Sequence, residues 1–267
     1  MKLQQPLQSF IDPFIKSCDG ELVASILDSG SNPPKNADYV FRLAGVIAEL
    51  KGLEEASFGE SFQNKMSALV ESWANRGLGI IWGTQRVDLA QLPPVCQQEV
   101  LDVIGKPLQR NILAKANQQI RATKESLKLP DAKGLLMVAS DGNEDLLPMD
   151  VLFFFWRILQ KRHADGTPQY SSIDALLYFN PRMPAVLPST GQPALIWGIA
   201  LRQPEDQQML DFLHELGDAF QRHMEKTTGT LFPSVEVEDA QYRELRFAGV
   251  SRRVPRIDAN YEAAKDK

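Results

Sequence analysis

Residues 36–53, NADYVFRLAGVIAELKGL, decide the fold of this chain. The run from Tyr39 to Phe41 and the pair Val46 and Ile47 are β-branched or aromatic residues, which favour strands. Between these two runs, the segment from Arg42 to Gly45 has the length and the glycine of a turn. The stretch therefore predicts a β-hairpin.

The predicted hairpin sets two carboxylates against each other. A loop centred between Leu43 and Ala44 pairs Asp38 with Glu49. Side chains alternate along a strand, so Lys51 shares the face of Glu49. Two opposed carboxylates about 4.5–5.5 Å apart at Cβ destabilise a sheet unless positive charge lies between them. We therefore expect a divalent cation at this point, with the Lys51 ammonium beside it.

An amphipathic helix is the alternative interpretation of the same stretch, because its apolar residues also fit one helical face. Gly45 and Gly52 would lie inside that helix, at a cost of about 1 kcal/mol each. The hairpin is the favoured prediction, and the helix remains an alternative. The apolar residues concerned are Leu43, Val46, Ile47, Leu50 and Leu53.

Asp38 followed by Glu49-Leu50-Lys51 resembles the signature of the PD-(D/E)XK nuclease superfamily, which has the restriction-endonuclease-like fold. That signature is an Asp on one strand and then, after a short connection, Glu-x-Lys on the next. Ala37 stands here where the signature has Pro before the Asp. The resemblance covers about residues 20–140 and rests on the side chains of Asp38, Glu49 and Lys51.

The resemblance implies a metal-dependent nuclease that hydrolyses phosphodiester bonds in DNA or RNA, with DNA the favoured partner. Asp38, Glu49 and the backbone carbonyl of Leu50 would hold Mg²⁺ or Mn²⁺, since oxygen ligands suit hard cations. Lys51 would steer the attacking water and offset charge on the phosphate. An acid from the first helix often joins such a site, and Glu21 is the candidate; a solvated Glu in a first helical turn is the alternative. A homodimer is a further expectation of the resemblance.

A second informative stretch, from about Gln97 to Leu129, predicts a long helix that Pro107 interrupts. At 100° per residue, Arg110, Asn117, Arg121, Lys124 and Lys128 share one face. Such a concentration of positive charge suits phosphate binding, although a solvated helix face gives the same pattern. Lys115 and Gln119 lie at the edge of the apolar face and are candidates for the cleft. The predicted nucleic-acid-binding residues are Arg110, Lys115, Gln119, Arg121, Lys124 and Lys128.

The remaining apolar runs predict further helices and strands around the hairpin. Their order predicts an α/β fold, a restriction-endonuclease-like mixed sheet flanked by helices. We expect one domain over 1–267, with a nuclease-like core at about 20–140, additional strands and helices at 141–245 and a frayed tail at 246–267. The predicted helices are 1–30 (with a second helix from Glu21 to Leu27, capped by Asp19), 62–75, 150–159 and 204–226. The predicted strands are 79–82, 134–140, 174–179 and 194–201, with a long loop at 180–193.

Composition limits the kinds of binding and the cellular location that we expect for this chain. The 267 residues carry a net charge of −5, which argues against a surface coated for nonspecific nucleic-acid binding but permits a local basic groove. Cys18 and Cys96 have no metal-ligand spacing and fit free thiols in a reducing cytoplasm. No apolar segment predicts a secretory signal or a membrane span, so we expect a cytoplasmic protein without membrane contact.

Other catalytic motifs are missing from the sequence. It has no glycine-rich phosphate loop and no nucleophile elbow. Two alternatives to a nuclease remain at this stage. One is a non-catalytic protein-binding or regulatory module on the same scaffold, and the other is a mainly helical interaction protein in which residues 38–53 form a helix.

Overall fold

The predicted hairpin forms and lies inside a larger sheet. Strand β2 (Tyr39–Phe41) runs antiparallel to strand β3 (Val46–Glu54), with Tyr39 opposite Ala48 and Phe41 opposite Val46. Gly45 closes the turn with a φ of 64°, a left-handed conformation that favours glycine. The hairpin and its register are confirmed, and the alternative of a helix over this stretch is wrong.

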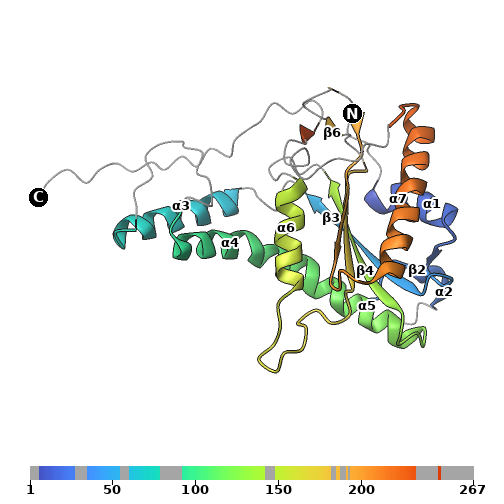
Figure 1. The fold of residues 1–267 in the computed structure, drawn as a ribbon, viewed down its shortest axis with the longest axis horizontal. Coiled ribbons are helices and arrows are strands. Elements are labelled where there is room, and N and C mark those ends of the chain that lie inside the picture. Colours follow the sequence, from blue (N-terminus) through green and yellow to red (C-terminus); the bar gives the residue numbers. More distant parts are fainter. Residues whose placement is uncertain are drawn as a thin grey trace, which may run out of the picture.

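The computed structural model describes residues 6–27, 35–54, 60–78, 92–141, 148–181, 185–186, 191, 193–232 and 246–247. The central feature is a mixed six-stranded sheet in the order β1-β2-β3-β4-β5-β8, with helices on both faces (Figure 1). The other strands of this sheet are β1 (Glu21–Leu22), β4 (Lys133–Asp141), β5 (Ala175–Phe179) and β8 (Trp197–Leu201). The predicted α/β class with a mixed sheet is confirmed.

The pairing of neighbouring strands changes twice along the sheet, from antiparallel to parallel and back. Strands β1, β2 and β3 form an antiparallel meander, after which β4 pairs parallel to β3 and β5 pairs parallel to β4. Strand β8 returns antiparallel to β5. A separate three-stranded sheet consists of β6 (Ala185–Val186), β7 (Pro193–Ala194) and β9 (Arg246–Phe247).

Helices α1 (Leu7–Ser17) and α7 (Gln207–Thr228) cover one face of the large sheet (Figure 1). Phe14 of α1 meets Phe220 of α7 edge to face, with ring centroids 5.3 Å apart, and Phe220 meets Phe179 of β5 in the same way at 5.4 Å. Edge-to-face pairs of this kind stabilise a core beyond the area that they bury. This packing fixes α1 against α7 and α7 against β5.

The opposite face carries the predicted long helix and α6 (Pro148–Leu159). The long helix is one continuous run of α4 (Pro94–Leu108), a π-helical turn (Gln109–Leu113) and α5 (Ala114–Ser126). Pro107, which lacks an N–H donor, lies just before the π turn, where the regular hydrogen-bond ladder changes. Helix α5 packs its Ile120 into the core that contains Ile47 and Leu136.

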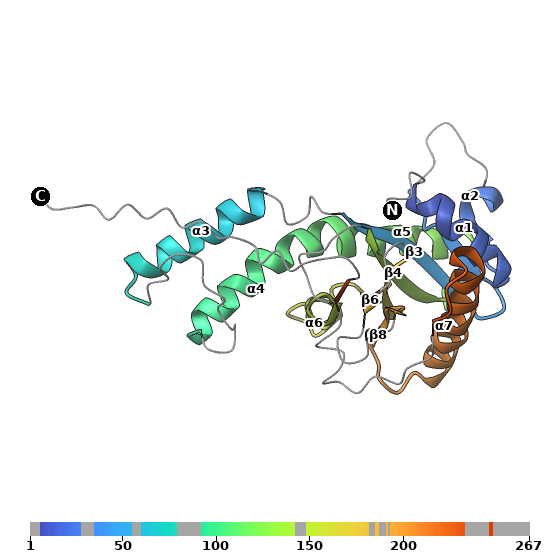
Figure 2. The same ribbon diagram turned by 90° about the horizontal axis from the view of Figure 1, so that it is seen from above.

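Helix α3 (Glu60–Asn75) lies along α4 and extends away from the sheet (Figure 2). The two helices share a small core that contains Trp73 and Cys96. The indole N–H of Trp73 donates to Glu99, 2.7 Å away, and Glu99 also pairs with Arg76. This helical pair therefore has its own apolar contacts beside the main core.

Three local predictions need correction. Glu21 and Leu22 form strand β1, so the second helix is only α2 (Val23–Ile26), and no side chain caps it. The predicted strand at 194–201 is divided into β7 and β8, and part of the predicted loop at 180–193 is strand. The predicted strand at 79–82 lies outside the described residues.

Candidate active site

The predicted carboxylate pair lies where β2 begins. Asp38 precedes β2 by one residue, so the observed register places it opposite Glu49. Its Oδ2 accepts a hydrogen bond from the Leu50 backbone N–H at 2.8 Å, and its Oδ1 accepts one from Gln8 of α1 at 3.2 Å. These contacts hold the Asp38 carboxylate against the edge of β3.

Glu49 is an acidic residue on the face of the sheet that packs against α5 and α6. Only 1% of the residue is exposed. Its Oε1 accepts a hydrogen bond from the Lys51 ammonium, whereas no donor among the described residues reaches its Oε2. A buried, unpartnered carboxylate oxygen is costly, so this atom is the strongest sign of an additional ligand.

The environment favours the protonated forms of both acids. Burial, followed by the negative charge of Asp38, raises the pKa of Glu49 to about 8, although the Lys51 ammonium opposes the shift. Burial also raises the pKa of Asp38, while the Leu50 N–H and the Lys51 charge oppose this. The two carboxyl groups can share a proton through a hydrogen bond. A divalent cation would displace that proton.

Lys51 is held from both sides. Besides contacting Glu49, its Nζ donates to Oε1 of Gln119 at 3.0 Å, and 21% of the Lys51 side chain remains exposed. Gln119 in turn donates through Nε2 to the backbone carbonyl of Asn36 at 3.0 Å. Helix α5 therefore positions the Lys51 amine and the segment leading into Asp38 with the same side chain. Gln119, predicted for the cleft, lies at the site.

A second residue of α5 anchors this segment. Thr123 Oγ1 accepts a hydrogen bond from the Ala37 N–H at 2.7 Å and donates to the Gln119 carbonyl at 2.9 Å. Thr123 has no exposed surface. The sequence analysis missed it because a Thr on an apolar helix face gives no signal by itself.

The backbone of Leu50 is oriented as the predicted ligand role requires. The N–H and C=O groups of one residue point to the same side of a strand. Because the Leu50 N–H donates to Asp38, its carbonyl also faces the Asp38 side. The Leu50 side chain packs into the core on the other face of the sheet, beneath α1 and α7. The Leu50 carbonyl and the Asp38 carboxylate therefore lie on the same side of β3.

The acid that the first helix brings to this region is Asp12, and Glu21 lies elsewhere. Glu21 pairs with Arg42 at 2.8 Å on an exposed part of the surface. Asp12 accepts a hydrogen bond from the Tyr39 hydroxyl at 2.9 Å, and its charge helps to raise the pKa of Asp38. Gln8 and Asp12 lie one turn apart on α1. This spacing predicts that they share one polar side of the helix, but it does not predict which residues they contact.

The predicted basic face does not form as one stripe. Arg110, Arg121 and Lys128 are exposed, and so is Lys115. Asn117, in contrast, is buried and accepts from the Ser172 N–H at 2.9 Å. Lys124 is largely buried, and its Nζ lies 3.8 Å from Asp174 Oδ2.

The π turn changes the angular phase of Arg110 relative to α5, but Asn117, Arg121 and Lys124 all follow it on α5. Asn117 and Lys124 are covered because this side of α5 packs beside Ser172 and Asp174. Asn117, Arg121 and Lys124 share one side of α5, as predicted, but that side is not an exposed basic stripe at Asn117 and Lys124.

No protein-family model matches the sequence, and neither a curated protein nor a solved structure matches it. In the described ranges, no group of three or more His, Cys, Asp or Glu side chains is arranged to hold a metal ion. None of the described helices is long and apolar enough to cross a membrane.

Proposed function

We propose that this protein is a metal-dependent nuclease of the PD-(D/E)XK type, with a restriction-endonuclease-like fold. Support comes from the placement of Asp38 and Glu49-Leu50-Lys51 on adjacent antiparallel strands, in the register that their spacing predicts. When both acids are ionised, Oε2 of Glu49 has no donor among the described residues, and Asp38 and Glu49 hold two negative charges against the one positive charge of Lys51. This state of the Glu49 carboxylate carries the proposal.

The residues present fit Mg²⁺ or Mn²⁺. Asp38 and Glu49 supply carboxylate oxygens and Leu50 a backbone carbonyl, and Mg²⁺ commonly takes only one or two carboxylates, with water and substrate phosphate completing its shell. When bound there, the ion would polarise the scissile phosphate and lower the pKa of its water. The raised pKa of Glu49 is consistent with a group that is stabilised as an anion only beside additional positive charge.

Lys51 is the residue that would act on the reacting phosphate. Its ammonium is fixed by Glu49 and Gln119 yet remains partly exposed, so a phosphate oxygen can approach it. A preorganised positive charge stabilises the negative charge that develops during phosphoryl transfer. Gln119 restricts the motion of the amine, which makes it a positioning residue.

Nucleic acid is the proposed substrate, with DNA favoured over RNA. Exposed Lys35 directly precedes Asn36, and exposed Lys115 lies one turn before Gln119 on α5. Arg121 extends the exposed positive charge along the same helix, and Lys128 extends it in the turn that follows the helix. Local basic side chains of this kind hold a phosphate backbone even on a chain of net charge −5.

A cleavage screen tests the proposal directly. Single- and double-stranded DNA and RNA are incubated with wild type in Mg²⁺, Mn²⁺ or EDTA, beside Glu49→Gln, Lys51→Ala and the matched control Glu99→Gln. We expect metal-dependent cleavage that falls by at least about 10²-fold in the first two variants, as expected for loss of transition-state charge stabilisation. Glu99→Gln, which removes a carboxylate on α4, should cut at the wild-type rate.

Wild-type rates in Glu49→Gln or Lys51→Ala would end the proposal. Absence of both cleavage and Mg²⁺ or Mn²⁺ binding by calorimetry would instead favour the non-catalytic binding module. Circular dichroism should show that all three variants keep the wild-type fold.

A further inference from the structure

One edge of strand β8 is not paired with any strand that the structure describes. Among the described strands, β8 pairs only with β5. The Arg202 N–H donates to the Asp174 carbonyl at 2.8 Å, so alternate residues 198, 200 and 202 direct their backbone groups toward β5. The backbone groups of 197, 199 and 201 therefore face away from the sheet. An unpaired edge of this kind is a template for another strand.

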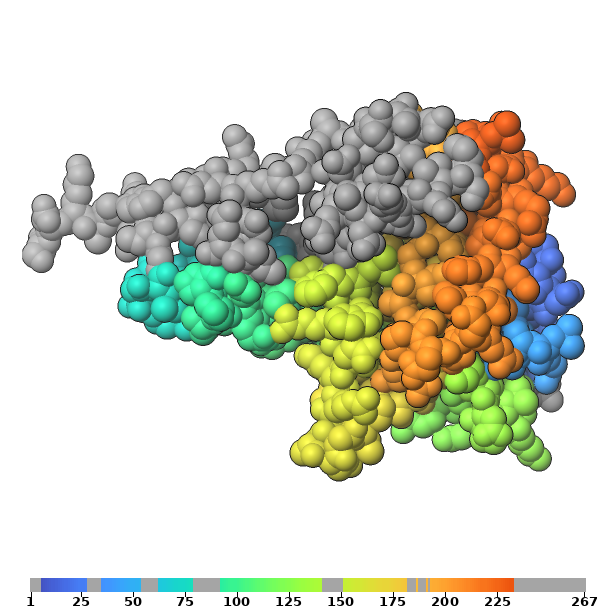
Figure 3. Space-filling view, viewed as in Figure 1, coloured from blue at the N-terminus to red at the C-terminus, as the bar shows by residue number. Residues whose placement is uncertain are grey.

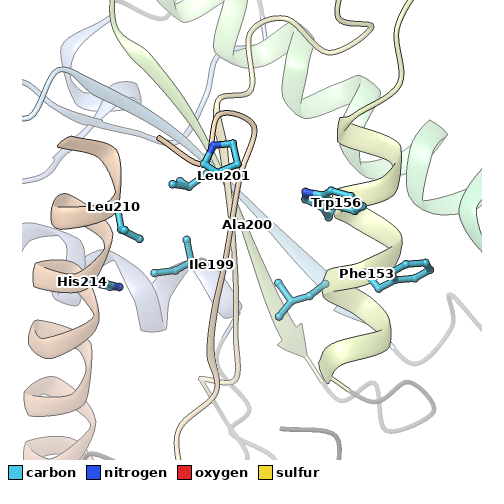
Figure 4. A pocket seen from close by; sticks show the side chains of 9 residues that line it. Phe153, Trp156, Ile199, Ala200, Leu201, Leu210 and His214 are labelled. Carbon is cyan, nitrogen blue, oxygen red and sulfur yellow. The ribbon is translucent and has the colours of Figure 1, made fainter. Parts of the chain in front are cut away.

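An apolar groove of about 510 Å³ accompanies this edge, between α6 and α7 (Figure 4). Trp156 points from α6 toward the groove in Figure 4, and 46% of this residue is exposed. Figure 3 shows α6 in yellow-green and α7 in orange on the same face of the molecule. The groove is lined by Leu152, Phe153, Trp156, Ile199, Ala200, Leu201, Pro204, Leu210 and His214.

We propose that β8 pairs antiparallel with β8 of a second copy of this chain, which joins the two large sheets through a two-fold axis. Residues 197, 199 and 201 are the only residues of β8 whose backbone groups face outward, and an antiparallel pairing centred on Ile199 uses all three. In that register, residue 197 of each copy lies opposite residue 201 of the other. A two-fold interface requires this self-complementarity, because each copy presents the same patch.

The position of α6 fits the same arrangement. Helix α6 contacts both β5 and β8, so its axis lies near the seam between them. The Leu152 side chain rests on Gly198, where an added Cβ would lie 2.3 Å from Leu152 Cδ1. With strands about 4.8 Å apart, the two α6 helices would lie about two strand spacings, roughly 10 Å, from each other across the axis. Helices pack at 8–10 Å, so the added strand brings them into contact.

The chemistry of the lining also favours a second copy. None of the lining residues is Lys, Arg, Asp or Glu. A two-fold axis brings like residues together, so a charged lining would repel itself, whereas an apolar one loses only its contact with water. The half-exposed indole of Trp156 gains the most from being covered, since aromatic side chains bury the largest areas.

Sedimentation of the full chain tests this proposal. Wild type should sediment as a species of twice 29.9 kDa at concentrations on the order of 10 μM, where a Kd of 1 μM leaves most chains paired. Ile199→Pro removes an outward N–H without removing a bond to β5, and Trp156→Lys places like charges across the axis. Both variants should be monomers. Val95→Lys, which changes a residue of similar exposure on α4, should remain a dimer.

A monomeric wild type at this concentration would overturn the proposal, and the groove would then belong to another partner or to none. A dimer that persists in Trp156→Lys would overturn it as well, whether or not Ile199→Pro folds. Circular dichroism establishes that each variant is folded. Glu49→Gln should remain a dimer, so failure of this proposal and failure of the proposed nuclease activity give different results.

Discussion

Replacing Glu49 by Gln should remove much of the pH dependence of stability in the metal-free protein. The pKa of Glu49 is raised from its ordinary value of 4.5 to about 8 by burial and by Asp38. The folded state therefore holds a proton that the unfolded state has released. The stability that this proton contributes is fully present below about pH 4.5 and is lost as pH rises through about 8.

The magnitude follows from linkage. One retained proton lowers the free energy of unfolding by up to about 1.4 kcal/mol for each unit of rising pH. Between pH 6 and 8 the wild type should lose about 2 kcal/mol through Glu49. The amide introduced by Glu49→Gln stays neutral over this range, can accept from Lys51 and can donate toward Asp38. The free energy of unfolding of the variant should therefore lack this part of its dependence on pH, and the variant should be more stable than wild type at pH 8.

Urea unfolding in EDTA at pH 6, 7 and 8, followed by circular dichroism, measures this difference. Glu99→Gln is the matched control, because its Arg76 and Trp73 partners lower the pKa of Glu99 and its titration lies below this range. Adding Mg²⁺ should stabilise wild type and leave Glu49→Gln unchanged. Equal slopes in wild type and Glu49→Gln would show that Glu49 is ionised throughout, and the reasoning would be refuted.

Three further substitutions test other contacts. Gln119→Leu should lower cleavage by about 10–100-fold and change its pH profile, because Lys51 loses its second partner; a folded variant with unchanged kinetics would contradict this. Gly134→Ala should lower the free energy of unfolding in urea by about 3 kcal/mol or more, since the new Cβ would lie 1.8 Å from the Ser172 carbonyl oxygen. Arg202→Met removes the guanidinium donor from the carbonyls of Leu159, Tyr170 and Ile173, of which Tyr170 keeps the Ile173 N–H, and should cost about 2–4 kcal/mol, measured in the same assay; a loss below about 1 kcal/mol would contradict it.

The hairpin could be predicted because its information is local. Strand formers, a turn of fitting length and Gly45 lie within one short stretch, and the turn alone fixes which residues oppose each other. The pairing of Asp38 with Glu49 follows from that register without knowledge of any other element. The long helix and most strands were also predicted, because apolar periodicity over many residues is a strong signal.

Contacts that depend on packing between distant elements could not be predicted. Asp12 approaches the site only because α1 packs on the far face of the hairpin, and nothing in its own sequence neighbourhood indicates Tyr39 as a partner. The partner of Lys124 is Asp174, at the start of a strand that follows two intervening elements. Periodicity also assumes a constant angle per residue, which the π turn violates.

The position of Glu49 is difficult to explain by stability alone. Apart from Lys51, its neighbours on the same face of β3 and β4 are apolar, with Ile47 before it, Leu53 beyond Lys51 and Leu136 beside it. A leucine at position 49 would continue that core, whereas the carboxylate there has a raised pKa and one oxygen without a donor among the described residues. Asp38 increases the cost by placing a second acid opposite. A positively charged ligand would stabilise the buried Glu49 carboxylate and offset its repulsion from Asp38, and both effects would favour binding of that ligand. Lys51, which Gln119 holds in place, lies where it can act on a phosphate bound beside such a ligand.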